Sequence, residues 1–151
     1  MESTTKTIAV DFDGTIVEHD YPRIGKEMRF AFASLRALQE KGHRLILWTF
    51  RTGTLLDEAV EYCRKNGIEF YAVNKSYPEE DVNDPNTPRK LDVDLFIDDR
   101  NVGGFPGWGE IFQSLHPGAG KFDHQLTDID AHNNYKRGGK SSIFARIFGG
   151  K

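Results

Sequence analysis

The chain has 151 residues, of which 38% are hydrophobic and 28% charged, with a net charge of -3 and a single cysteine. These values are typical of one globular domain, and they exclude an internal disulfide and a metal cluster built on several cysteines. No apolar run approaches the roughly 18 residues of a membrane span, and the polar N-terminus does not resemble a signal peptide. We therefore expect a cytoplasmic protein.

The charge is unevenly distributed along the chain. From Lys121 to Lys151 there are six basic and three acidic residues, so this tail carries +3 and the preceding part of the chain -6. An acidic body disfavours nucleic acid as a partner and suits a site that attracts divalent cations. We expect one domain over residues 1–120 and a basic tail over 121–151. The tail is expected either to be disordered or to dock, and docking could form a homo-oligomer.

Hydrophobic periodicity predicts alternating strands and helices in the first 120 residues. Strands are expected at Lys6–Val10, Arg44–Thr49, Ile68–Val73 and Leu91–Ile97, and helices at Lys26–Glu40, Thr54–Asn66 and Glu110–Leu115. The proline-containing segment Tyr77–Arg89 and the glycine-rich segment Gly103–Gly109 are expected to be loops. Strands separated by helices favour parallel pairing with right-handed crossovers. The fold class expected is therefore α/β, a Rossmann-like three-layer sandwich with a mainly parallel sheet.

Polar side chains follow three of the expected strands. Asp11 and Asp13 follow the first strand, Thr49 ends the second, and Asp98 and Asp99 follow the fourth. Ligands of open α/β sheets bind at the carboxyl ends of the strands, where these residues should gather. Buried carboxylates need a cation or a reaction to offset their repulsion, and Mg²⁺ prefers such oxygen ligands.

The segments that carry these residues resemble a known enzyme superfamily. Asp11-Phe12-Asp13-Gly14-Thr15 resembles the first motif, Asp-x-Asp-Gly-Thr, of the haloacid dehalogenase-like hydrolases, and the resemblance extends from about Thr7 to Leu115. The run from Ile97 to Gly104 is similar to that of small capless bacterial phosphatases in the same superfamily. Both usual insertion points of the cap domain are short here, so no sizeable cap is expected.

The resemblance implies a role for each residue. Asp11 would be the nucleophile that forms an aspartyl-phosphate, and Asp13 would be the general acid and base, with its backbone carbonyl on Mg²⁺. Thr49 and Lys90 would bind the phosphoryl group and complete the catalytic set. Asp11, the Asp13 carbonyl and Asp98 would ligate Mg²⁺, and Asp99 would lie beside them or reach the ion through water. Lys75 is the alternative to Lys90, since it also follows a strand.

Other polar residues near these motifs have less definite roles. Arg51 and Arg100 either contact the substrate or form surface salt bridges, and His19, Tyr21 and Arg23 lie where the superfamily places a flap over its site. The expected function is a Mg²⁺-dependent phosphatase that acts on a phosphorylated small molecule or an accessible polymer. The alternatives are a phosphotransferase, a hydrolase that acts on a non-phosphate bond, and a non-catalytic phospholigand-binding or scaffold protein.

Overall fold

The structure of the protein is a computed structural model that describes residues 4–118. The chain divides into two compact units, the first ending at Gly104 and the second starting at Phe105. The tail that begins at Lys121 lies outside the described residues, so its docking stays a prediction. No helix among residues 4–118 is long and apolar enough to cross a membrane.

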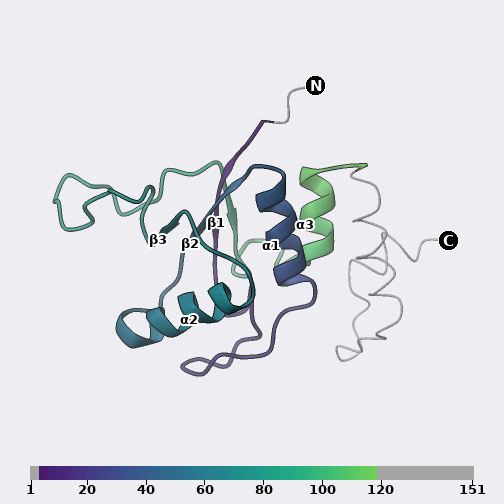
Figure 1. The fold of residues 1–151 in the computed structure, drawn as a ribbon, viewed down its shortest axis with the longest axis horizontal. Helices are drawn as coiled ribbons and strands as arrows, with labels where there is room; N and C mark the ends of the chain where they lie inside the picture. The colour runs from purple at the N-terminus through teal and green to yellow at the C-terminus, as the bar shows by residue number, and fades with distance from the viewer. Residues whose placement is uncertain (1–3, 119–151) are drawn as a thin grey trace. The chain divides into compact units, whose positions relative to one another are not determined.

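The first unit is built on a parallel four-stranded sheet in the order β3-β2-β1-β4 (Figure 1). The strands are β1 (Thr7–Val10), β2 (Arg44–Leu47), β3 (Ala72–Val73) and β4 (Leu95–Ile97). The central strands β1 and β2 are almost entirely buried, which explains why they are apolar runs without a polar alternation. The α/β Rossmann-like fold with a parallel sheet and no sizeable cap is confirmed.

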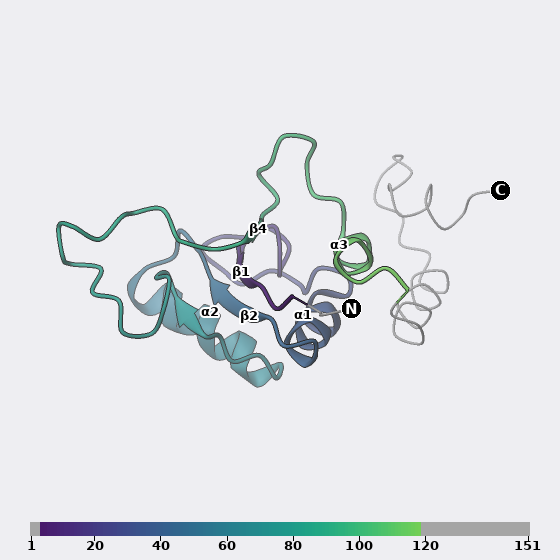
Figure 2. The same ribbon diagram turned by 90° about the horizontal axis from the view of Figure 1, so that it is seen from above.

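The two faces of this sheet are covered differently. Helices α1 (Ala31–Glu40) and α2 (Gly53–Lys65) lie on the same side of the strands (Figure 2), as right-handed crossovers in one direction require. On the opposite face, Leu91 from the irregular segment before β4 packs against Ala9, Ile46 and Ala72. Within the first unit, one covering layer is therefore helical and the other is a loop.

The first helix is shorter than the sequence predicts. It begins at Ala31 rather than Lys26, because Phe30 adopts a left-handed backbone conformation with φ 64°. The preceding residues pair instead with the chain after β1: Met28 N–H donates to Ile16 O at 2.8 Å, and Glu18 N–H donates to Lys26 O at 2.7 Å. These bonds make residues 18–26 a closed excursion, which is hereafter called the flap.

All four strands are shorter than predicted, and β3 and β4 are shortened most. The segment 68–71 is outside β3, and the residues before Leu95 cross the sheet face instead of joining β4. Their apolar character comes from packing, since Ile68 and Leu91 are buried without being part of the ladder. The absence of helix and strand between Tyr77 and Arg89 agrees with the predicted loop.

The second unit contributes one described helix, α3 (Trp108–Leu115), which starts two residues before the predicted Glu110. Trp108 and Phe112 are buried, and the Phe105 and Trp108 rings meet edge to face with centroids 5.9 Å apart. Gly107, with φ 102°, precedes the helix in a conformation that glycine adopts without strain.

Candidate functional site

Backbone pairing brings the acidic residues together at the carboxyl edge of the sheet. Asp11 N–H donates to Ile97 O at 2.9 Å, which continues the β1–β4 pairing one residue past the end of β1. Asp98 and Asp99 follow Ile97 directly, so they leave the sheet beside Asp11. One carboxylate oxygen from each of Asp11, Asp98 and Asp99 lies within 4.8 Å of the others. The predicted convergence of these three residues is therefore present in the fold.

Thr15 lies between two of these carboxylates. Its side chain is fully buried, and its hydroxyl is 3.0 Å from Asp11 Oδ2 and 3.2 Å from Asp99 Oδ1, so its single proton can be donated to either. The same oxygen accepts a hydrogen bond from Asp99 N–H at 3.0 Å. Thr15 therefore sets the separation between the Asp11 and Asp99 side chains.

Gly14 makes this close approach possible. Its φ is 88°, and a Cβ placed there would lie 2.8 Å from Asp99 Cγ, well inside normal contact. The position of Asp99 leaves no room for a side chain at Gly14, and the positive φ is a second, separate reason for glycine. This accounts physically for the glycine in Asp-x-Asp-Gly-Thr.

The site raises the pKa of the Asp11 carboxyl from 3.8 to about 7. Burial is the largest cause, followed by the negative charge of Asp98 and a side-chain hydrogen bond with Asp99. The hydrogen bond from Thr15 acts in the opposite direction, because it stabilises the charged form. Burial and the neighbouring charge of Asp98 therefore disfavour the ionised form of Asp11 when no cation is bound.

The donor set fits a hard divalent cation. Three carboxylates at this spacing offer only oxygen ligands, as Mg²⁺ prefers, and the repulsion at Asp11 would be relieved by a positive charge. The Asp13 side chain is not part of this cluster. Its predicted contribution to the metal site is its backbone carbonyl, and its carboxylate is bound elsewhere.

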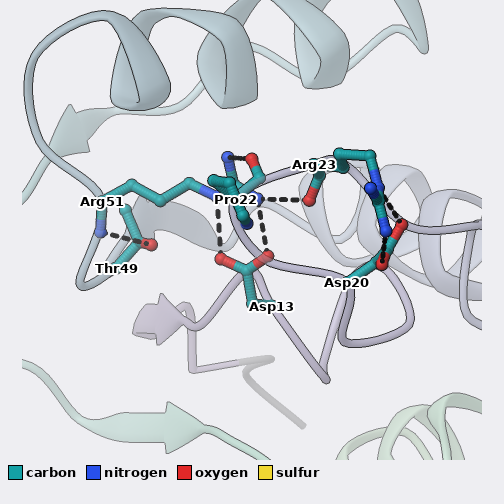
Figure 3. Close-up of polar contacts among 6 residues, drawn as sticks. All are labelled: Asp13, Asp20, Pro22, Arg23, Thr49 and Arg51. Carbon is teal, nitrogen blue, oxygen red and sulfur yellow. Dashed lines mark hydrogen bonds and ion pairs between the residues drawn. The ribbon is translucent and has the colours of Figure 1, made fainter.

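The Asp13 carboxylate is held by a buried arginine (Figure 3). Arg51 Nε donates to Asp13 Oδ2 at 2.8 Å and Arg51 Nη2 donates to Asp13 Oδ1 at 2.7 Å, which makes a bidentate pair. The Arg51 side chain is fully buried, and the hydrogen bond with Asp13 is the largest cause that raises its pKa. We expected Arg51 either to contact the substrate or to form a surface salt bridge. The structure shows neither, because the pair is buried and the guanidinium is bound to groups of the protein.

Arg51 also binds the flap. Nη1 donates to Pro22 O at 3.0 Å and Nη2 donates to Arg23 O at 2.8 Å. The guanidinium carbon lies 5.1 Å from the centroid of the Phe12 ring and 5.3 Å from that of Tyr21. One charged group thus connects Asp13, the loop after β2 and the flap.

Thr49 lies two residues beyond the end of β2 rather than in its last position, and its backbone is held by a side chain that follows the neighbouring strand. Its N–H donates to Asn74 Oδ1 at 2.8 Å, and its hydroxyl oxygen accepts from Arg51 N–H at 3.2 Å. Asn74 follows β3 with φ 54°, a left-handed conformation that Asn tolerates better than most residues. The Thr49 hydroxyl proton remains available to a ligand oxygen in this arrangement.

A cavity lies beside Asn74. It has a volume of about 280 Å³, and its lining includes Trp48, Asn74, Glu80, Arg89 and Leu91. Trp48 packs against the loop-covered face of the sheet, so the cavity lies under the segment before β4. It belongs to this face, whereas the acidic cluster lies at the sheet edge.

The lysines do not join the acids. Among residues 4–118, no ion pair links Lys75 or Lys90 to Asp11, Asp13, Asp98 or Asp99. Lys90 is exposed and Lys75 half-buried, and the choice between them stays open.

The remaining candidate residues of the flap and of the loop after β4 interact with residues close to them in the sequence. Arg23 pairs with exposed Asp20 at 3.0 Å, and only its backbone carbonyl faces Arg51. His19 and Arg100 are exposed, and Arg100 N–H donates to Asp98 Oδ1 at 2.9 Å.

Two residues that shape the site had no role in the sequence-based hypothesis. Thr15 was part of the quoted motif, and a hydroxyl four residues after Asp11 in a tight turn is a usable signal. Asn74 could have been considered because it follows a strand, as Thr49 does. The pairing of Arg51 had no comparable signal, because it depends on how the flap folds.

No protein-family model matches the chain. No curated protein sequence matches it either. The solved structure of a conserved protein from Bacteroides thetaiotaomicron does, with 62% sequence identity and a TM-score of 0.70, over 74% of this chain and 90% of that chain. At this identity and coverage the likeness extends beyond a shared fold, and the chain belongs to the same protein family as this conserved Bacteroides thetaiotaomicron protein.

Proposed function

We propose that the protein is a Mg²⁺-dependent phosphohydrolase that works through an aspartyl-phosphate on Asp11. The observation that carries the proposal is the cluster of Asp11, Asp98 and Asp99 at the carboxyl edge of the sheet, with oxygen atoms within 4.8 Å of one another. Thr49 follows the adjacent strand β2 by two residues and offers a hydroxyl at the same edge. The resemblance to the haloacid dehalogenase-like superfamily supports the same assignment.

The proposed reaction has two steps. An Asp11 carboxylate oxygen attacks phosphorus, and the bond from phosphorus to the ester oxygen breaks as Asp13 transfers a proton to that oxygen. Water then attacks the aspartyl-phosphate while Asp13 accepts a proton from it, and phosphate and the Asp11 carboxylate are regenerated. Bound Mg²⁺ would supply the positive charge that lets an anionic nucleophile approach an anionic phosphate.

One observation favours a second candidate, a protein that binds phosphate compounds without hydrolysing them. Both Asp13 oxygens accept hydrogen bonds from Arg51, so proton transfer to a leaving group requires this pair to loosen. If the pair persists with substrate bound, the site retains its binding residues and lacks a free general acid. Turnover of a phosphate ester with a poor leaving group distinguishes the two candidates.

The test is hydrolysis of an aryl phosphate and an alkyl phosphate by the wild-type chain with and without Mg²⁺. The proposal expects both esters to be hydrolysed, turnover to stop in chelator, and Asp11→Asn to be inactive while still folded. Asp98→Ala is expected to weaken the dependence on Mg²⁺ more than Asp99→Ala. Full activity of Asp11→Asn, or undiminished activity in excess chelator, contradicts the proposal.

A further inference from the structure

Two aromatic side chains are exposed close to Thr49. Phe50 is 88% exposed and is the most exposed aromatic side chain among residues 4–118, while Tyr21 is 42% exposed. Their rings meet edge to face, with centroids 6.3 Å apart and an interplanar angle of 65°. One comes from the loop after β2 and the other from the flap, so the tertiary fold brings them together.

The position of this pair relative to the candidate phosphate site follows from the chain itself. Phe50 is the residue after Thr49, whose hydroxyl is assigned to the phosphoryl group, and consecutive Cα atoms are about 3.8 Å apart. Tyr21 lies over the Arg51 guanidinium at 5.3 Å, and the same guanidinium holds Asp13. A phosphate ester bound at Asp11 and Thr49 would have the aromatic pair within reach of its organic part.

The support beneath Tyr21 is rigid. Arg51 is fully buried and makes side-chain hydrogen bonds with Asp13 and with the carbonyls of Pro22 and Arg23 (Figure 3). Because the guanidinium is fixed, the Tyr21 ring above it loses little conformational freedom when a ligand binds. Phe50 adds an exposed apolar ring that is not part of the core and is accessible to a ligand.

We propose that Tyr21 and Phe50 form a subsite for a flat aromatic ring in the leaving group of the substrate. The inference rests on the proposed function for the position of the phosphate, and it adds the chemical class of the substrate: a phosphate monoester whose alcohol carries a nucleobase or an aryl ring. Stacking on aromatic side chains recognises such rings through their flat faces and apolar area.

The experiment compares two ligands that share the phosphate and the pentose and differ in the ring. Adenosine 5′-monophosphate and ribose 5-phosphate are titrated by calorimetry, with Mg²⁺ present, into the Asp11→Asn chain, which under the proposed function binds without turnover. The expected result is a preference of about tenfold for the nucleotide, the size that stacking of one base gives. Phenyl phosphate against an alkyl phosphate of similar size then separates a general aryl subsite from one for nucleobases.

Adding Phe50→Ala to this chain should reduce the preference to about onefold and leave the affinity for ribose 5-phosphate unchanged. The matched control is Tyr77→Ala, since Tyr77 is an aromatic side chain that is 47% exposed outside the pair; it should leave the preference intact. Equal affinity of the parent chain for both ligands, or a preference that survives Phe50→Ala, overturns the subsite.

The outcomes separate this inference from the proposed function. Hydrolysis of an aryl phosphate by the wild-type chain, together with equal binding of the two ligands, leaves the function standing and removes the subsite. A Phe50-dependent preference in a chain that hydrolyses no ester supports the subsite and removes the phosphohydrolase. If Phe50→Ala lowers the oligomeric mass, the ring packs against a second copy, which also overturns the subsite.

Discussion

Replacing Asp11 with Asn should stabilise the protein when no metal is bound. Burial and the neighbouring acids raise the pKa of Asp11 from 3.8 to about 7 in the folded chain, a shift of about three pKa units. At about 1.4 kcal/mol for each unit, the ionised carboxylate costs the folded state up to about 4 kcal/mol at pH 8. Asn keeps the shape and removes the charge, so Asp11→Asn should recover much of that free energy.

The stability difference between Asp11→Asn and wild type should depend on pH in a definite direction. Because the folded-state pKa is raised, the folded chain binds more protons than the unfolded chain between about pH 4 and pH 7. The penalty is complete above pH 7 and disappears as the pH falls toward 4. The advantage of Asp11→Asn over wild type should shrink across the same window.

The assay is urea unfolding in excess chelator at pH 8 and pH 5, followed by tryptophan fluorescence. Asp57→Asn is the control, since Asp57 is an exposed carboxylate on α2 and its replacement should change the free energy of unfolding little. Saturating Mg²⁺ should reverse the order, because the ion stabilises the folded wild type by mass action and binds the variant less tightly. An Asp11→Asn chain that is less stable than wild type in chelator at pH 8 would refute the electrostatic account.

Three further predictions concern the residues around the cluster. Arg51→Ala should cost about 3–5 kcal/mol of stability, because it leaves the Asp13 carboxylate without its buried partner; Arg51→Lys should restore part of this, and equal stability of both variants to wild type in urea would contradict the pairing. Gly14→Ala should cost about 1–3 kcal/mol and weaken Mg²⁺ binding measured by calorimetry, since the added Cβ meets the Asp99 side chain. Thr15→Val removes the hydroxyl between the carboxylates, so it should cost more free energy of Mg²⁺ binding than free energy of unfolding. Unchanged Mg²⁺ affinity would show that the carboxylates keep their spacing without this hydroxyl.

The sequence predicts which residues gather at the carboxyl ends of the strands better than it predicts where each helix and strand begins and ends. Asp11, Asp98 and Thr49 could be placed together because parallel strands bring their carboxyl ends to one edge, whatever the detailed side-chain packing. The helix that begins at Ala31 could not be delimited, because residues before Phe30 continue an apolar pattern while pairing with the chain after β1. Hydrophobic periodicity indicates which residues are buried, and residues before Phe30 can be buried either in a longer helix or in pairing with the chain after β1.

The role of Arg51 lay beyond sequence reasoning for a different reason. An arginine two residues after a strand is compatible with a surface pair, a ligand contact or a buried pair, and only the fold of the flap decides among them. The carbonyls of Pro22 and Arg23 supply two of its acceptors, and carbonyls carry no residue-specific signal. The partner of Asp13 thus became visible only in three dimensions.

The uneven covering of the sheet affects how the protein should open locally. The face opposite α1 and α2 is sealed by an irregular segment, with Leu91 as its fully enclosed apolar contact in the cluster with Ala9, Ile46 and Ala72. Segments with few buried contacts detach at a lower free energy than the whole domain unfolds. Amide hydrogens between Ser76 and Lys90 should therefore exchange with solvent sooner than those of β1 and β2. Lys90 adjoins Leu91 in the chain, so a contribution of Lys90 to the site would depend on this segment staying packed on the sheet through Leu91 and Val93.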